Sequence, residues 1–321
     1  MSVRVARLRS LAKVNLDLRV LHKRADGYHE LRTVFQTISL ADRIEISYDP
    51  SVRKTSIAIE GNIEIPGNLI VTAAEKVMAA ARAKGEVRFK LHKEIPMGGG
   101  LGGGSSNAAA VLLGLPVLLG RDLPQAKLDE IAKSLGSDIN FFLYGGTALG
   151  LGRGTELYPL PDFPKKKRGL LVAPGIHVST GDAFRGLARS VVEGPVTEPV
   201  DFREAVWAIE SAGDLSRCRN DFETSVYRLY PAMRRLHNAL AKAPGANFVR
   251  MSGSGSSIFS FVDEGHSPLF DGAGLKRSIL EHCTVHEIET ISRRDYRLMW
   301  MRQLKEHTAG TLWPPRSRYA Q

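Results

Sequence analysis

A run of glycines between residues 98 and 104 is the part of this sequence best suited to chemistry. Residues 96–107 read PMGGGLGGGSSN. Bare backbone N–H groups in such a loop, and the positive end of a following helix dipole, both favour an anion and above all a phosphate. The alternative is a flexible linker. The residues of the predicted phosphate loop are Pro96, Met97, Gly98, Gly99, Gly100, Leu101, Gly102, Gly103, Gly104, Ser105, Ser106 and Asn107.

The segments on either side of the glycines favour the phosphate loop over the linker. Before them, Val87, Phe89 and Leu91 alternate with polar residues, which predicts a strand. After them, SSNAAAVLLGL is small and then apolar, which predicts a buried helix opened by a Ser or Asn N-cap. Linkers rarely join a clear strand to a clear helix.

The common phosphate-loop patterns do not account for this segment. A Walker A motif needs Gly-Lys-Ser/Thr, which is absent. The Rossmann spacing occurs at Gly98, Gly100 and Gly103, but a run of glycines satisfies many spacings, and the next segment predicts a second helix in place of a strand. A protein-kinase loop would need HRD and DFG downstream, and neither occurs.

Residues 96–107 resemble the ATP loop of the GHMP kinases, which phosphorylate small alcohols and acids. Two more segments are similar to motifs of that family: AKVN at 12–15 and the strand-turn-strand pattern of residues 247–263, which alone would fit a plain hairpin. The resemblance implies an α+β fold in two domains. These are an ATP-binding N-terminal domain, residues 1–164, and a ferredoxin-like C-terminal domain, residues 165–294, followed by a basic extension, residues 295–321.

The segment DGYHE at 26–30 narrows the resemblance to the branch of the family that phosphorylates 4-diphosphocytidyl-2-C-methyl-D-erythritol (CDP-methylerythritol). In that branch this Tyr-His pair holds the cytosine, so Tyr28 and His29 are predicted substrate residues, with Phe184 as a second aromatic. Flat rings offer stacking faces, and their polar edges can read a base. The alternative for Tyr28 and His29 is an aromatic pair packed in a hairpin.

The resemblance also implies the catalytic residues. Lys13 falls on the first motif, and Asp138, in SDINFF, falls on the catalytic acid of the family, while Ser137 and Asn140 replace its Ala and Pro. Asp138 would accept the hydroxyl proton, and Lys13 would neutralise the transferring phosphoryl group. A helix N-cap is the alternative for Asp138. The remaining implied contacts are Asn15, Gly253 and Ser254 to the substrate and Asn68, also a simple N-cap candidate, to the adenine end.

Composition limits the other classes of function. The chain has 321 residues, 43% hydrophobic and 24% charged, with no apolar segment long enough to span a membrane. The N-terminus lacks an apolar signal-peptide core, and Cys218 and Cys283 provide neither a disulfide framework nor metal spacing, which favours a cytoplasmic location. The net charge of +10 suits polyanionic ligands, although a solvated basic face is the alternative.

We therefore expect ATP and CDP-methylerythritol as ligands, with no nucleic acid, membrane or protein partner. Mg²⁺ is expected to accompany ATP, but its ligands stay unknown because the sequence shows no carboxylate cage. Two other functions remain open: a GHMP kinase for homoserine, mevalonate or a sugar, and a non-enzymatic RNA-binding protein. The DGYHE segment with Phe184 argues against the former, and Lys13 with Asp138 argues against the latter.

Simple patterns predict the supporting elements. Alternation predicts a strand near Val14 and further strands between Val34 and Ile46, and helical spacing predicts helices over residues 67–85 and 124–136. The segment 295–321 reads as an added tail, in which Leu298 and Trp300 dock on the body and the Pro-rich end stays mobile.

Overall fold

The structure is a computed structural model that describes residues 2–187, 200–263, 265–266 and 282–320. Its strands are β1 (Arg4–Lys23), β2 (His29–Asp49), β3 (Ser56–Gly61), β4 (Glu86–His92), β5 (Thr147–Gly152), β6 (Glu156–Pro159), β7 (Arg168–Ala173), β8 (Ala246–Met251), β9 (Ile258–Val262) and β10 (Thr284–Glu289). Its helices are α1 (Leu69–Ala80), α2 (Gly103–Leu119), α3 (Gln125–Leu135), α4 (Ile139–Tyr144), α5 (Thr180–Arg185), α6 (Val200–Ala212), α7 (Phe222–Leu229), α8 (Pro231–Ala241) and α10 (Arg293–Gln303).

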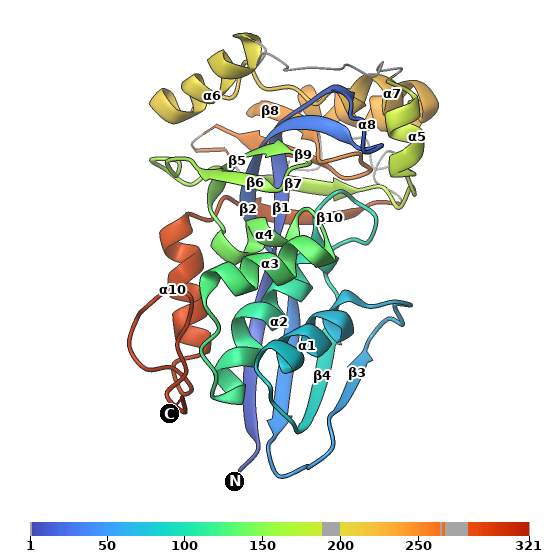
Figure 1. Ribbon diagram of the computed structural model, residues 1–321. Helices are drawn as coiled ribbons and strands as arrows, with labels where there is room; N and C mark the ends of the chain where they lie inside the picture. The colour runs from blue at the N-terminus through green and yellow to red at the C-terminus, as the bar shows by residue number, and fades with distance from the viewer. Residues whose placement is uncertain (1, 188–199, 264, 267–281, 321) are drawn as a thin grey trace.

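Strands β1 and β2 are the long axis of the molecule. They pair antiparallel along almost their whole length and extend from the end that holds the N-terminus to the opposite end (Figure 1). The separate strands expected between Val34 and Ile46 are one continuous strand, because β2 pairs with β5 in its first half and β4 in its second. Within the described residues, the larger sheet has the order β3-β4-β2-β5-β6, with β1 on β2.

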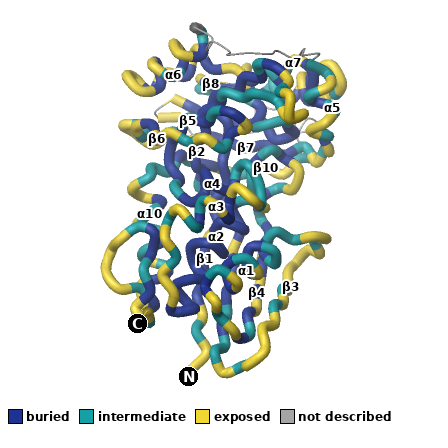
Figure 2. Tube along the Cα trace, viewed as in Figure 1, coloured by how far each residue is buried: buried dark blue, intermediate teal, exposed yellow. Residues whose placement is uncertain are grey.

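Helices α1 to α4 cover one face of the lower part of this sheet (Figure 1). Helix α2 carries small and apolar residues on all sides, and it is buried from Ser106 to Leu119. Figure 2 shows it as part of the dark interior between the other helices and the strands. A helix without a polar face is stable only inside a core, so α2 is a rigid support for the loop before it.

The second sheet has the order β10-β7-β9-β8, and its strand pairs are antiparallel. Helices α7 and α8 pack on it through Phe222, Val226, Met233 and Leu236. This is the ferredoxin-like arrangement expected for the C-terminal half, and the α+β fold is confirmed.

Strand β1 contributes to each of three hydrophobic clusters in turn. Leu8 and Leu11 join the cluster around α1 and α2, Val14 and Leu16 join the central cluster, and Leu18 and Val20 join the cluster with α7 and α8. The two halves of the molecule therefore share a strand. The proposed boundary between residues 164 and 165 separates chain segments that both pack on β1.

The C-terminal segment packs against the first half of the molecule. Trp300 is buried as expected, together with Tyr296, whereas Leu298 is 39% exposed. The expected mobility of the Pro-rich end is wrong, because the Ser317 hydroxyl donates to the Val117 carbonyl (2.6 Å) and Arg4 stacks on Tyr319. The Tyr296 hydroxyl donates to the Phe142 carbonyl of α4, which links this segment to the helix after Asp138.

Candidate active site

The glycine loop is held against the rest of the protein by its carbonyl groups. The backbone N–H groups of Ser257 and Lys13 donate to the carbonyls of Gly99 (3.2 Å) and Leu101 (3.0 Å), and the Ser252 hydroxyl donates to that of Gly100 (2.9 Å). Gly100 has φ +74°, and a methyl group there would lie 2.0 Å from the Ser252 carbonyl oxygen. Only glycine permits this approach.

Helix α2 begins directly after the loop and lacks a side-chain cap. The N-cap is Gly102, with φ +69°, and no side chain accepts from the first turn. The expected Ser or Asn cap is therefore wrong, since the helix starts two residues before Ser105. Its first N–H groups are therefore free, and together with the positive end of the helix dipole they suit an anion better than a capped end would.

A cavity of about 360 Å³ lies over this loop and helix end. Asn68 is both a cap and a lining residue, because its Oδ1 accepts from the Ile70 N–H (3.1 Å). Ser106 does not line the cavity; it is buried, and its hydroxyl donates to the Leu11 carbonyl (2.7 Å). The other predicted loop residues that line the cavity are Pro96, Met97, Gly98, Gly99, Gly100, Leu101, Gly102, Gly103, Gly104, Ser105 and Asn107.

Lys93 lines the same cavity and was not predicted. Its side chain is 4% exposed, and its ammonium is paired with the buried carboxylate of Asp42. The other Asp42 oxygen accepts from the N–H groups of Glu94 and Ile95, both at 2.8 Å. A lysine at the end of a strand gives no signal in a single sequence that it will be buried beside a ligand cavity.

Lys13 and Asp138 meet beside the glycine loop, although they are far apart in the sequence. The Lys13 ammonium lies 3.5 Å from Oδ2 of Asp138 and donates to Oδ1 of Asn15 (2.6 Å). Burial lowers the pKa of Lys13, and the Asp138 charge acts in the opposite direction. Asp138 occupies the N-cap position of α4, but its side chain caps no N–H group, so the carboxylate is available to the cavity.

Two irregularities in the pairing of β1 with β2 flank these residues. The register shifts between Leu11 and Lys13 and again between Asn15 and Asp17. Bulges re-aim side chains and are frequent beside active sites. Lys13, Asn15 and Asp138 line a cavity of about 280 Å³ together with Gly100, Gly102, Gly253 and Ser254.

The third sequence motif packs directly on the glycine loop. A methyl group on Gly253 would lie 3.3 Å from the Gly100 backbone, and the hydroxyls of Ser254 and Thr180 are 3.1 Å apart. The Asn220 amide donates to the carbonyls of Met251 and Gly253, both at 2.8 Å. Asn220 therefore fixes the turn that covers the loop.

The three predicted aromatic residues line a larger cavity of about 620 Å³, but they are not equivalent. His29 stacks on Phe184, with ring centres 4.3 Å apart and planes 17° apart, whereas Tyr28 is 55% exposed and lies beneath the Arg153 guanidinium. Burial, helped by the charges of Lys23 and His22, lowers the pKa of His29 and favours its neutral ring. Three cations that the sequence did not single out also line the cavity: Lys23, Arg153 and Arg185.

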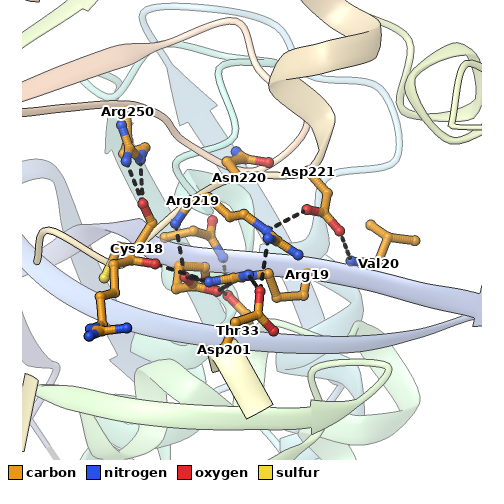
Figure 3. Close-up of polar contacts among 12 residues, drawn as sticks. Arg19, Val20, Thr33, Asp201, Cys218, Arg219, Asn220, Asp221 and Arg250 are labelled. Atoms are coloured by element: carbon orange, nitrogen blue, oxygen red, sulfur yellow. Dashed lines mark hydrogen bonds and ion pairs between the residues drawn. The ribbon is translucent and has the colours of Figure 1, made fainter. Parts of the chain in front are cut away.

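A cluster of charges behind the site, in which Arg19 and Asp17 are buried and Asp201 and Arg219 are about half exposed, ties β1 to the C-terminal half. Arg19 is 1% exposed and pairs with Asp17 (2.6 Å) and with Asp201 of α6 (2.5 Å), and Arg219 pairs with Asp201 (2.8 Å). Figure 3 shows this cluster, with Asp221 accepting from the Val20 N–H. Breaking such a pair leaves an uncompensated buried charge, so the cluster fixes how β1 meets the loop that carries Asn220.

The described residues contain neither a membrane-spanning helix nor a preformed metal-binding group. No helix in the described ranges has the length and apolar composition needed to cross a membrane. No group of three or more His, Cys, Asp or Glu side chains in those ranges is arranged to hold a metal ion.

Known proteins show the same sequence pattern and arrangement. Residues 68–146 match the GHMP kinases N terminal domain and residues 205–269 the GHMP kinases C terminal domain. A curated 4-diphosphocytidyl-2-C-methyl-D-erythritol kinase from Solibacter usitatus (strain Ellin6076) is 49% identical over 99% of both chains. One from Moorella thermoacetica is 38% identical over 82% of this chain and 92% of its own.

Solved structures agree with these relatives. A crystal structure of 4-(cytidine 5'-diphospho)-2C-methyl-D-erythritol kinase superposes with a TM-score of 0.72 at 33% identity, covering 88% of this chain and 98% of its own. A homoserine kinase from Cytophaga hutchinsonii, with a TM-score of 0.67 but 18% identity over 91% of this chain and 96% of its own, shares the fold alone. With its glycine loop, its Lys13–Asp138 pair and its full-length similarity, the chain belongs to the 4-diphosphocytidyl-2-C-methyl-D-erythritol kinases within the GHMP kinase family.

Proposed function

We propose that this protein transfers the γ-phosphoryl group of ATP to the 2-hydroxyl of CDP-methylerythritol, in non-mevalonate isoprenoid precursor biosynthesis. One observation carries the proposal: the three cavities adjoin. Gly100 and Gly102 line both the loop cavity and the Lys13 cavity, and Asp138 and Phe184 line both the Lys13 cavity and the aromatic cavity. A path therefore leads from the phosphate loop, past the acid, to the aromatic rings.

In this proposal the loop cavity holds ATP. Its lining includes Asn68, Lys93 and the predicted residues 96–107 except Ser106. The uncapped N-terminus of α2 offers N–H groups to the phosphates. Ser106 supports the loop from behind through its bond to Leu11.

The phosphoryl transfer needs positioning and charge neutralisation more than covalent catalysis. The oxygen of the 2-hydroxyl forms a bond to the γ-phosphorus, and Asp138 accepts the proton of that hydroxyl. The bond from the γ-phosphorus to the β,γ-bridging oxygen breaks, and ADP leaves. Lys13 lies 3.5 Å from Asp138 and stabilises the charge on the transferring group. Asn15 holds the ammonium in place.

Mg²⁺ belongs to the proposal as the ion that accompanies ATP and shields its phosphate charge. Magnesium in kinases is held largely by substrate phosphates with one or two carboxylates. The ATP phosphates would therefore be its main ligands.

The cytidine diphosphate end would bind in the aromatic cavity. Tyr28, His29 and Phe184 offer ring faces and polar edges to the base, and Lys23, Arg153 and Arg185 offer positive charge to the diphosphate. Gly253 and Ser254 would contact the erythritol part between the two ends. We also propose a cytoplasmic location, because the two cysteines of the sequence, Cys218 and Cys283, provide no disulfide framework.

A substrate screen tests the proposal. We expect ATP consumption with CDP-methylerythritol to exceed that with homoserine, mevalonate or a sugar by at least roughly 10⁴-fold in kcat/KM, as a site built for polar recognition permits. Phosphorus NMR of the product should show a new phosphate monoester. Preference for another alcohol, or salt-sensitive RNA binding without ATP turnover, would overturn the proposed substrate or the enzymatic function, respectively.

A further inference from the structure

A chain of three buried hydrogen bonds runs from the Lys13 ammonium into the sheet. The ammonium donates to Oδ1 of Asn15 (2.6 Å), Nδ2 of Asn15 donates to Oγ1 of Thr33 (2.8 Å), and Oγ1 of Thr33 donates to the Asp17 carbonyl (2.7 Å). Lys13, Asn15 and Thr33 are 3%, 2% and 1% exposed, so water does not replace these partners.

The direction of the chain is fixed by chemistry at both ends. The Asp17 carbonyl can only accept, so Thr33 must give it the one hydrogen of its hydroxyl. The Thr33 oxygen is then an acceptor toward Asn15, which must present its NH₂ group. The Asn15 oxygen is left facing Lys13, and an ammonium group can only donate.

We propose that Thr33 is a positioning residue that sets the orientation of the Asn15 amide and thereby holds the catalytic ammonium in place. The inference rests on the proposed function, and it adds a residue of β2 that has no place in the phosphoryl transfer described above. Thr33 borders the same cavity as Lys13 but is 1% exposed, and it acts through Asn15. Its hydroxyl anchors the NH₂ end of the amide, and the Lys13 ammonium takes the oxygen end.

The surroundings of Lys13 make this orientation consequential. Asp138, before α4, faces the ammonium at 3.5 Å, Arg153 lines the same cavity, and the Phe35 ring centre of β2 lies 5.4 Å away. The positive end of α2 begins at Gly102, where a methyl group would lie 3.2 Å from the Lys13 side chain. On β1 itself, the Asp17 carboxylate is paired with Arg19 and does not serve Lys13. Among the described residues, the Asn15 oxygen and the Asp138 carboxylate are thus the side-chain oxygens that face the ammonium.

The test compares Thr33→Val with Thr33→Ser. Valine keeps the shape, including the methyl group that packs near Gly150, but has no hydroxyl, whereas serine keeps the hydroxyl and lacks that methyl group. With valine, the Asn15 NH₂ group loses its acceptor, so one of the two hydrogen bonds that hold the amide in place is gone. We expect kcat to fall by roughly 10–100-fold with an unchanged KM for ATP, and serine to stay close to wild type.

The pKa of Lys13 provides a readout that a merely structural role would not move. An Asn15 oxygen that is held less firmly stabilises the ammonium less, so the already lowered pKa of Lys13 falls further in Thr33→Val. The ammonium is the active form, so the alkaline limb of the kcat profile moves to lower pH. Carbon-13 NMR of the lysine ε-methylene groups measures this pKa directly, with Lys13→Arg to assign the signal.

The outcomes separate the inference from the proposed function. An inactive wild-type protein contradicts the function, while the NMR titration still tests the role of Thr33. If Thr33→Val leaves the pKa of Lys13 and kcat unchanged, or if serine behaves like valine, the inference is wrong. Should valine prevent folding, Thr33→Ala against Thr33→Ser isolates the same hydroxyl, and the same two outcomes decide.

Discussion

The two ends of the active site are built from different materials. The phosphate end is mostly backbone, with glycines such as Gly99 and Gly100 whose neighbours leave no room for a methyl group, tied by carbonyl groups to β1 and to the third motif. The nucleoside end consists of side chains, with Tyr28 half exposed and with room beside it, because a methyl group on Gly27 would meet no atom within 4 Å. The phosphate end is therefore rigid and does not tolerate larger residues in place of its tightly packed glycines. Side chains at the nucleoside end can vary without loss of the fold.

The largest expected effect lies where the two ends meet. Asp138→Asn keeps the size of the side chain but removes the proton acceptor, so kcat should fall by roughly 10²–10⁴-fold. Steady-state turnover with CDP-methylerythritol measures it. ATP affinity and the melting temperature serve as controls, and both should stay near wild type. A nearly normal rate would remove Asp138 from the chemistry.

At the phosphate end, Gly100→Ala should weaken ATP binding and destabilise the fold together. The methyl group meets the Ser252 carbonyl at 2.0 Å, so the loop must shift, and backbone strain of about 1–3 kcal/mol is expected. Calorimetric titration with ATP measures the first effect and urea unfolding the second.

Gly310→Ala is the matched control for that variant. Gly310 has a similar φ of +73°, but a methyl group there would meet no atom within 4 Å. The Gly310→Ala variant therefore reports the conformational cost alone. It should leave ATP affinity unchanged. Equal ATP affinities in the two alanine variants would show that the tight packing of Gly100 does not serve the nucleotide.

At the nucleoside end, Phe184→Ala should raise the KM for CDP-methylerythritol and leave the KM for ATP unchanged. Loss of one base–aromatic contact costs about 1–3 kcal/mol. Initial rates with each substrate varied in turn provide the measurement. Tyr158→Ala, which removes an aromatic ring that is 52% exposed on β6, should change neither KM. An equal rise in both KM values for Phe184→Ala would contradict a role confined to the nucleoside end.

The smallest effect should come from the C-terminal segment. Tyr296→Phe removes the hydroxyl that donates to Phe142, at a cost of about 1 kcal/mol in the free energy of unfolding. Urea denaturation measures it. Leu298→Ala, at an exposed site of the same helix, should cost less than about 0.5 kcal/mol. The two variants would be equally stable if the segment only rested loosely on the body.

The sequence reveals contiguous motifs more readily than single residues whose role depends on distant partners. The glycine loop is a contiguous pattern, and the resemblance it carries led to Lys13 and Asp138, whose meeting depends on the whole fold. Lys93, Arg153 and Thr33 left no signal, because each is a single ordinary residue that matters only through a partner distant in the chain. The start of α2 was misplaced because Ser105 is a good N-cap by type, whereas the glycines, with their left-handed backbone, already form the turn before it.

Tertiary contacts also overrode two local expectations. Gaps in the apolar pattern of β2 suggested separate strands, but continuous pairing with β1 holds it as one. The Pro-rich end looked mobile by composition, yet the hydroxyl of Ser317 and the ring of Tyr319 fasten it to α2 and β1.

Strand β1 supplies side chains to each of the three apolar clusters, so neither half of the molecule owns a complete interior. Cutting the chain between residues 164 and 165 would leave the later fragment without β1, on which its helices α7 and α8 pack. Neither fragment should be self-sufficient, and mixing the two should restore a folded, heat-cooperative species with a single calorimetric peak. Evolution of this architecture by exchange of whole halves would then require the exchanged half to match a strand it does not encode.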